Sequence, residues 1–167
     1  QMVFDARDSF SWDFQKCRVR NGPVLGGDWR NYEDRPGKPG WISHRKGSVL
    51  KFENLRFSAG ERASLIVAYL RGYEGMGSAK LTINGQPTWS TELNGVWAMN
   101  ATQTDIFFAS ATHRGYGRRF EWTLVSRLRQ GDRQTTKPSF QPHVNATLII
   151  ENTEDGLKFK VMQVSVC

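Results

Sequence analysis

A membrane-spanning helix needs a hydrophobic run of about 18 residues. No run in this sequence approaches that length, so we expect no membrane span. It also has no segment with a sustained 3.6-residue apolar period, and helix is expected only as one or two short turns. A Gly-X-Ser-X-Gly elbow, an early Gly-Asp-Ser with a late Asp-X-X-His, an EF-hand loop and a His-X-X-X-His pair are all missing. These absences argue against the common serine hydrolases and against a zinc site.

Cysteine is scarce as well, with Cys17 and Cys167 near the two ends of the chain. A disulfide between them would close nearly the whole chain and stabilise it by about 5 kcal/mol, less any strain. Glycosylation sequons begin at Asn100 and Asn145, and the chain starts at Gln1 without a signal peptide. We therefore expect an extracellular or secretory location and a processed protein or a module of a longer one. The alternative is two unrelated buried thiols in a cytosolic protein.

What the sequence does contain is aromatic residues, which make up 12% of its 167 residues and include six Trp and ten Phe. Aromatic residues favour strands and also provide flat binding surfaces. The length suits one domain with a substantial core, and no internal repeat or second-domain boundary is present. We expect a single domain over residues 1–167.

Short strand-like runs recur with turn residues between them. The apolar run Leu65–Leu70 is typical of a central strand covered on both faces, and Asn84-Gly85 is a strong hairpin dipeptide. The pattern predicts an all-β antiparallel sandwich of about eight strands with little helix. The expected strands are Met2–Asp5, Ser11–Phe14, Ser48–Leu55, Ala63–Arg71, Ala79–Asn84, Thr104–Ala109, Arg119–Ser126, Asn145–Glu151 and Leu157–Val166.

Two long segments, Asn21–Gly40 and Leu128–Pro142, are expected to be loops. The net charge of +7 is concentrated in two stretches, residues 16–46 and 113–137, each with a net charge of +5. If these stretches meet in space, they favour an anionic partner. The alternative is that the charge only keeps the loops solvated.

Three segments carry a family resemblance: PGKPGWISHRKGSVLKFENL from Pro36, GYEGMGSAKLTINGQ from Gly72 and GLKFKVMQVSVC from Gly156. In this order they resemble the non-catalytic galactose-binding-like jelly-roll segments that accompany SGNH/GDSL-type esterase domains in plant and algal secreted proteins. The chain departs from that pattern at Gly72, where the family has Ser. The resemblance implies an eight-stranded jelly roll in a cell wall or secretome, and it brings no catalytic residue.

Sugar-binding sandwiches combine loop aromatics that stack on pyranose rings with polar side chains that bond the hydroxyl groups. Arginine would pair with the carboxylate or sulfate of an acidic glycan. Among the other tryptophans, Trp41 is expected to be core. The candidate ligand-binding residues are Trp29, Arg30, Tyr32, Arg35, Trp97, Arg114, Tyr116, Arg118 and Arg119, with Asp34 beside them.

The sequence also allows two catalytic interpretations. A polysaccharide lyase would draw on His113, Arg114 and Tyr116, and a glycosidase would need a carboxylate pair such as Glu74 and Asp105. No cofactor is expected. A structural Ca²⁺ held by Asp5, Asp8, Asp155 and neighbouring carboxylates is a further hypothesis.

The sequence favours a non-catalytic extracellular module that binds a glycan, with an anionic cell-wall or extracellular polysaccharide as the expected ligand. It would act alone or as the accessory domain of a covalently linked catalytic domain. The alternatives are a stand-alone carbohydrate-active enzyme of the lyase type and a protein–protein adhesion module. A nucleic-acid partner is not expected, because no known nucleic-acid module is recognisable.

Overall fold

The computed structural model describes residues 22–34, 36–55, 62–84, 89–113, 120–124, 139–140 and 146–166. For residues 62–63, 89, 110–113, 120–124 and 139–140 it describes the backbone only. Every regular element in this part of the chain is a strand, and none of it is a helix that could cross a membrane.

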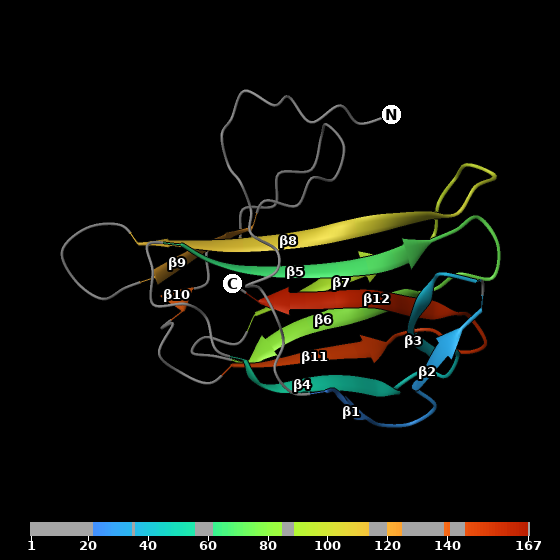
Figure 1. Cartoon of the computed structure of the whole chain (residues 1–167), viewed down its shortest axis with the longest axis horizontal. Coiled ribbons are helices and arrows are strands. Elements are labelled where there is room, and N and C mark those ends of the chain that lie inside the picture. Colours follow the sequence, from blue (N-terminus) through green and yellow to red (C-terminus); the bar gives the residue numbers. More distant parts are fainter. Residues whose placement is uncertain are drawn as a thin grey trace.

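The strands form two antiparallel sheets (Figure 1). The five-stranded sheet has the order β1-β4-β11-β6-β7, and the seven-stranded sheet has the order β10-β9-β8-β5-β12-β3-β2. The strands are β1 Val24–Leu25, β2 Arg30–Glu33, β3 Pro39–Ser43, β4 Val49–Leu55, β5 Arg62–Arg71, β6 Ser78–Asn84, β7 Trp89–Asn94, β8 Gln103–His113, β9 Phe120–Leu124, β10 Ser139–Phe140, β11 Ala146–Asn152 and β12 Phe159–Val166.

Eight of these strands have the connectivity of a jelly roll. The block β3-β12-β5-β8 belongs to one sheet and the block β4-β11-β6-β7 to the other. From β3 onward the chain changes sheet between β3 and β4, β4 and β5, β5 and β6, β7 and β8, β10 and β11, and β11 and β12, which is the order of two interlocked Greek keys. The expected all-β jelly roll is thus confirmed, and β1, β2, β9 and β10 extend its edges.

The core lies between the sheets and follows the period of two along the strands. In β11 every second residue is buried, from Ala146 through Leu148 and Ile150 to Asn152. Leu65 and Val67 of β5 are fully buried, and β5 is the middle strand of its sheet, as expected for a central strand. Full burial of each such aliphatic side chain contributes about 1.5–3 kcal/mol.

Two irregularities explain why some strands do not alternate cleanly in sequence. In β4, Asn54 has a φ of 55°, and the register with β11 shifts there. Phe52 and Leu55 therefore both face the core although they are three residues apart. A second shift in β12 buries both Val161 and Val164. Such bulges add a residue and keep the apolar side chains on the inner face.

The segment Asn21–Gly40 is not one long loop, because it contains β1, β2 and the start of β3. All four residues of β2 are exposed, so the strand has no apolar alternation that would reveal it. The second expected loop contains β10, and β7 was also missed. The expected strands at Met2–Asp5 and Ser11–Phe14 lie outside the described residues.

Candidate functional site

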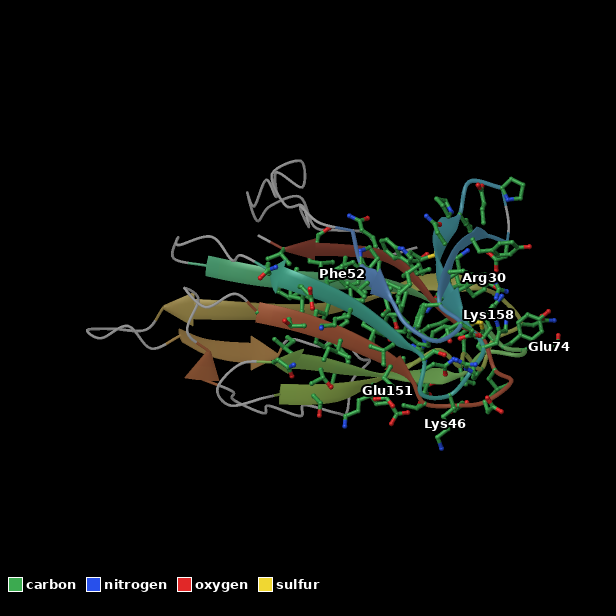
Figure 2. The ribbon with its side chains drawn as sticks, turned by 90° about the horizontal axis from the view of Figure 1, so that it is seen from below. Arg30, Lys46, Phe52, Glu74, Glu151 and Lys158 are labelled. Atoms are coloured by element: carbon green, nitrogen blue, oxygen red, sulfur yellow. The ribbon has the colours of Figure 1, made fainter. Side chains whose placement is uncertain are left out.

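Four connections gather at one end of the sandwich (Figure 1). They are residues 34–38 between β2 and β3, 72–77 between β5 and β6, 95–102 between β7 and β8, and 153–158 between β11 and β12. We call these four connections the loop end. Figure 2 shows Glu74, Lys158 and Arg30 at this end, whereas Phe52 lies further along the sheets.

Backbone hydrogen bonds join three of these connections in series. The Gly77 amide donates to the Lys158 carbonyl at 2.9 Å, and the Gly95 amide donates to the Gly77 carbonyl at 3.0 Å. The Gly72 amide then donates to the Gly95 carbonyl at 2.9 Å, and the Trp97 amide donates to the Gly72 carbonyl at 2.8 Å. The loop end therefore has a fixed backbone, although its loops come from distant parts of the sequence.

Glycine is required where these backbones touch. A Cβ atom on Gly95 would lie 2.3 Å from the Gly77 carbonyl oxygen, and one on Gly77 would lie 2.9 Å from the Leu157 side chain. Gly75 has a φ of 63°, in the left-handed region. The glycines from Gly72 to Gly77 thus serve turn geometry and close packing of the backbone.

Arg71, at the end of β5, is held by three groups. Its Nη1 atom donates to Asp105 at 3.0 Å, and its Nη2 atom donates to the Val96 carbonyl at 2.8 Å. Its guanidinium carbon lies 4.7 Å from the centre of the Trp97 ring. Arginine over a tryptophan face is a favourable cation–π arrangement. The three contacts together position the Trp97 ring on the fixed loop backbone.

Asp105 of β8 continues this set of contacts into the core. It accepts a second hydrogen bond, from the Tyr69 hydroxyl at 3.4 Å, and the Tyr69 ring stacks on Phe159 at 5.7 Å. Burial raises the pKa of the Tyr69 phenol, and the neighbouring Asp105 charge raises it further. Tyr69 is therefore a neutral donor, and Asp105 is engaged internally rather than available as half of a glycosidase pair with Glu74.

Large side chains stand exposed around this centre. Tyr73 follows Gly72 directly and is 52% exposed, and Met99 of the β7–β8 connection is 58% exposed. Trp97 is half-buried, and Glu74 is exposed. The Tyr73 side chain is therefore turned toward solvent and does not pack within the glycine loop.

Asp34 ties the β2–β3 connection to β12. Its carboxylate accepts hydrogen bonds from Lys158 at 3.1 Å and from the fully buried Lys160, which also donates to the Lys38 carbonyl at 2.6 Å. Burial alone would raise the pKa of Asp34, but the hydrogen bonds and positive charges of the two lysines lower it to about 2. Asp34 is thus a structural anchor and not a free sugar ligand.

Asp28 plays a similar part at the start of β2. It accepts hydrogen bonds from the Ser43 hydroxyl and from the His44 amide at 2.9 Å. The buried Asn152 side chain donates in turn to Ser43 at 3.3 Å. Burial opposes the charge on Asp28, yet the hydrogen bonds, first of all that from Ser43, lower its pKa to about 2. The described residues contain no cluster of three metal-binding side chains.

The candidate aromatics from the sequence fall into different environments. Trp29 is only 4% exposed and belongs to the core, so we correct its assignment as a ligand-binding residue. Arg30 and Tyr32 stand exposed on β2, with the guanidinium 5.6 Å from the ring centre. Trp41 packs edge-on against Phe52, as expected of a core residue. Trp97 is the one aromatic candidate that lies within the four connections of the loop end.

Only some of the remaining candidates are among the residues that the structure describes. Asn100 is exposed in the β7–β8 connection, Asp155 accepts a hydrogen bond from the Lys46 amide at 3.3 Å, and His113 is described by its backbone alone. The others lie outside the described residues: Arg35, Arg114, Tyr116, Arg118, Arg119, Asn145, Cys17, Cys167, Asp5 and Asp8.

The sequence interpretation missed Arg71 and Tyr73 as parts of this site. One signal was present, since both flank a glycine in a loop that follows a buried strand. What the sequence did not show is that Gly72 lies against Val96 and Trp97.

None of the protein-family models or curated protein sequences compared with this chain matches it. Among solved structures, the chain is similar to the CBM36-1 domain of a multidomain xylanase from the hindgut metagenome of Trinervitermes trinervoides, with 10% identity over 87% of this chain and 90% of that one and a TM-score of 0.46. It is similar to CBM35 from Cellvibrio japonicus Abf62, with 15% identity over 90% of this chain and 89% of that one and a TM-score of 0.46.

A family 35 carbohydrate binding module from Clostridium thermocellum gives 13% identity over 86% of this chain and 92% of that one, with a TM-score of 0.43. At these identities and TM-scores we take no argument from the similarity. The jelly-roll assignment rests on the strand order, and the function is argued from the loop end.

Proposed function

We propose that this chain is a non-catalytic glycan-binding module whose binding surface is the loop end. The observation that carries the proposal is the Trp97 ring, fixed by Arg71, with the exposed Tyr73 on the β5–β6 connection that is bonded to the Trp97 backbone through Gly72. Flat aromatic surfaces bind sugars by stacking, and they bind best when they are held in place before the ligand arrives. Here the hydrogen bonds among Gly72, Gly77 and Gly95 provide that rigidity.

We further propose that the ligand is anionic. The chain carries a net charge of +7, and one of its two basic stretches, residues 16–46, includes β2 and the connection that follows it. The positive charge of the chain as a whole attracts acidic polysaccharides over a longer range than contact forces do. The module would be secreted. It would work alone or as the accessory domain of a wall-modifying enzyme, like the non-catalytic segments that the sequence resembles.

The test is a binding titration of the full chain, made in bacteria, with soluble polysaccharides of matched length. The acidic probes are glucuronoxylan and polygalacturonate, and the neutral probes are arabinoxylan and a mixed-linkage β-glucan. We expect binding to at least one acidic probe and a marked loss of affinity between about 50 mM and about 500 mM NaCl, because salt screens exposed charges. No binding to any of the four probes would contradict the proposal.

Variants then locate the surface. Trp97→Ala and Tyr73→Ala are each expected to weaken binding about tenfold or more, equivalent to at least about 1.4 kcal/mol. Tyr32→Ala removes a ring of similar exposure, 49% against 52%, on β2 outside the four connections, and is expected to weaken binding less than Tyr73→Ala does. If Tyr32→Ala abolished binding and Tyr73→Ala did not, the site would be on β2 and the loop end would be excluded.

A further inference from the structure

The β7–β8 connection contains the sequon Asn100-Ala101-Thr102 at its outermost part. The Ala101 amide donates to the Met99 carbonyl at 2.6 Å, so the backbone makes a tight turn centred on Asn100. Residues 98–101 are all exposed, whereas the connection is anchored earlier, at Gly95 and Trp97. A sequon on an exposed turn is what an enzyme that modifies asparagine can reach.

This turn is next to the proposed binding surface. Asn100 comes three positions after Trp97, and three residues of fully extended chain span at most about 10 Å. At the other end of the sequon, the Thr102 hydroxyl oxygen lies 3.7 Å from the position of a Cβ atom on Gly72, the residue before Tyr73. The modification site therefore lies close to Trp97 and Tyr73 at the loop end.

We propose that Asn100 carries an N-linked glycan and that this glycan covers the loop end, so that glycosylation weakens ligand binding. In the modifying step, Nδ2 of Asn100 bonds to the anomeric carbon of a lipid-pyrophosphate-linked oligosaccharide and loses a proton. The bond from that carbon to the pyrophosphate breaks, and the lipid pyrophosphate leaves with the electron pair. The effect on ligands rests on the proposed function, whereas the covering of Tyr73 does not.

The physical argument is one of size and solvation. A branched oligosaccharide of several rings is longer than the separation between Asn100 and Trp97, so it sweeps the volume in which a polysaccharide would lie. The attached glycan is also held at a high effective concentration next to a surface proposed to bind sugars. Both effects raise the free energy of binding an external chain.

The first measurement is occupancy. The full chain is expressed in eukaryotic secretory cells and its peptides are mapped by mass spectrometry. We expect a glycan on Asn100 that is absent in Asn100→Gln and in Thr102→Ala and is retained in Asn145→Gln, which removes the other sequon. An unmodified Asn100 in the secreted chain would overturn the proposal.

The second measurement detects covering without any ligand. Tetranitromethane nitrates exposed tyrosine rings, and Tyr73 and Tyr32 are 52% and 49% exposed. We expect nitration of Tyr73 to be severalfold slower in the glycosylated chain than in the same chain trimmed by an endoglycosidase to a single sugar. Tyr32 serves as the internal control and should react equally in both forms. Equal nitration of Tyr73 in both forms would overturn the proposal.

The third measurement is binding of glucuronoxylan and polygalacturonate by the glycosylated and the trimmed chain. We expect the dissociation constant to be at least about tenfold higher with the intact glycan, and the Asn100→Gln chain to behave as the trimmed one. If the trimmed chain binds and the glycosylated chain binds equally well, this inference fails and the proposed function stands. If neither form binds but Tyr73 is protected, the proposed function fails and the covering of the loop end stands.

Discussion

The guanidinium carbon of Arg71 lies 4.7 Å from the centre of the Trp97 ring, while the same guanidinium is bonded to Asp105 and to the Val96 carbonyl. Its side chain is only 14% exposed. The Arg71 side chain therefore links β5 to β8 and to the β7–β8 connection. This role is different from that of the exposed arginines expected to meet an acidic ligand, and it leads to the first prediction.

Arg71→Lys is expected to weaken polysaccharide binding about tenfold and to lower the free energy of unfolding by about 1–2 kcal/mol. A lysine retains the charge but has no planar group to lie over Trp97 while bonding both Asp105 and the Val96 carbonyl. Chemical denaturation and binding titration measure the two effects. The matched control is Arg45→Lys in the exposed β3–β4 turn, which should change neither quantity. Equal behaviour of the two variants would show that the fork geometry is not needed.

Asp34→Asn is expected to lower the free energy of unfolding by about 3 kcal/mol, because it leaves the fully buried Lys160 without its carboxylate. Lys160→Met removes the charge together with the need for a partner and should cost less. The double variant should then be more stable than Asp34→Asn alone. Urea denaturation of the four proteins forms a double-mutant cycle, and strictly additive costs would contradict the pairing.

Acid should destabilise the fold in a defined window through Asp34 and Asp28. Both have a pKa lowered from 3.8 to about 2 in the folded chain. The folded state therefore favours the ionised form of each carboxyl group. The resulting stabilisation is fully present above about pH 4 and is lost as the pH falls through about 2. Each group should account for about 1–2 kcal/mol after allowance for solvent screening.

The measurement is the free energy of unfolding between about pH 5 and about pH 2 for the unaltered chain, Asp34→Asn and Asp28→Asn. Each variant should show a shallower decline than the unaltered chain. Glu74→Gln, at an exposed position, should follow the unaltered chain. Parallel curves for all four proteins would rule out the assigned role of the two aspartates.

Gly95→Ala is expected to destabilise the fold by about 2 kcal/mol or more and to reduce binding, since its Cβ atom would lie 2.3 Å from a backbone oxygen. Gly72→Ala is the matched comparison in the same set of hydrogen bonds. Its Cβ atom would lie 3.0 Å from the flexible Met76 side chain, which can move aside. Thermal unfolding of both variants tests whether close backbone packing sets the shape of the loop end, and a milder effect at Gly95 would argue against it.

Trp29→Ala is expected to cost about 3–5 kcal/mol in the free energy of unfolding, as for other large core side chains. At a temperature where the variant remains folded, its affinity for glucuronoxylan and polygalacturonate should be unchanged, because the ring lies in the core. The pair of measurements separates a core residue from a binding residue. A stable variant with lost affinity would restore Trp29 to the binding surface.

The fold could be read from the sequence wherever one face of a strand is buried. β5, β6, β11 and β12 were predicted to within a few residues, because their apolar side chains alternate or run together. The strand β2 could not be predicted, since all its residues are exposed and its stability comes from pairing with β3 and from Asp34, which bonds lysines more than a hundred residues away.

The site was less predictable for the same physical reason. Trp29 and Trp97 each come two residues after a glycine in the sequence, yet one ring is buried in the core and the other is half-buried at the loop end. What distinguishes them is the position of residues distant in sequence, Arg71 and Asp105 for Trp97 and the core side chains for Trp29. Local composition does not encode these neighbours.

The order of the strands also governs when the chain can fold. β11 lies between β4 and β6, and β12 lies between β5 and β3, so the last two described strands each occupy an interior position in a sheet. On the ribosome, which releases the chain from its N-terminus, both sheets stay divided until residues 146–166 emerge. Pairing across such long separations is slow, and the unpaired edges of β4, β5 and β6 remain open to aggregation meanwhile. Folding should therefore be completed only after residues 146–166 have left the ribosome, and chaperones that protect strand edges should raise the yield of this protein.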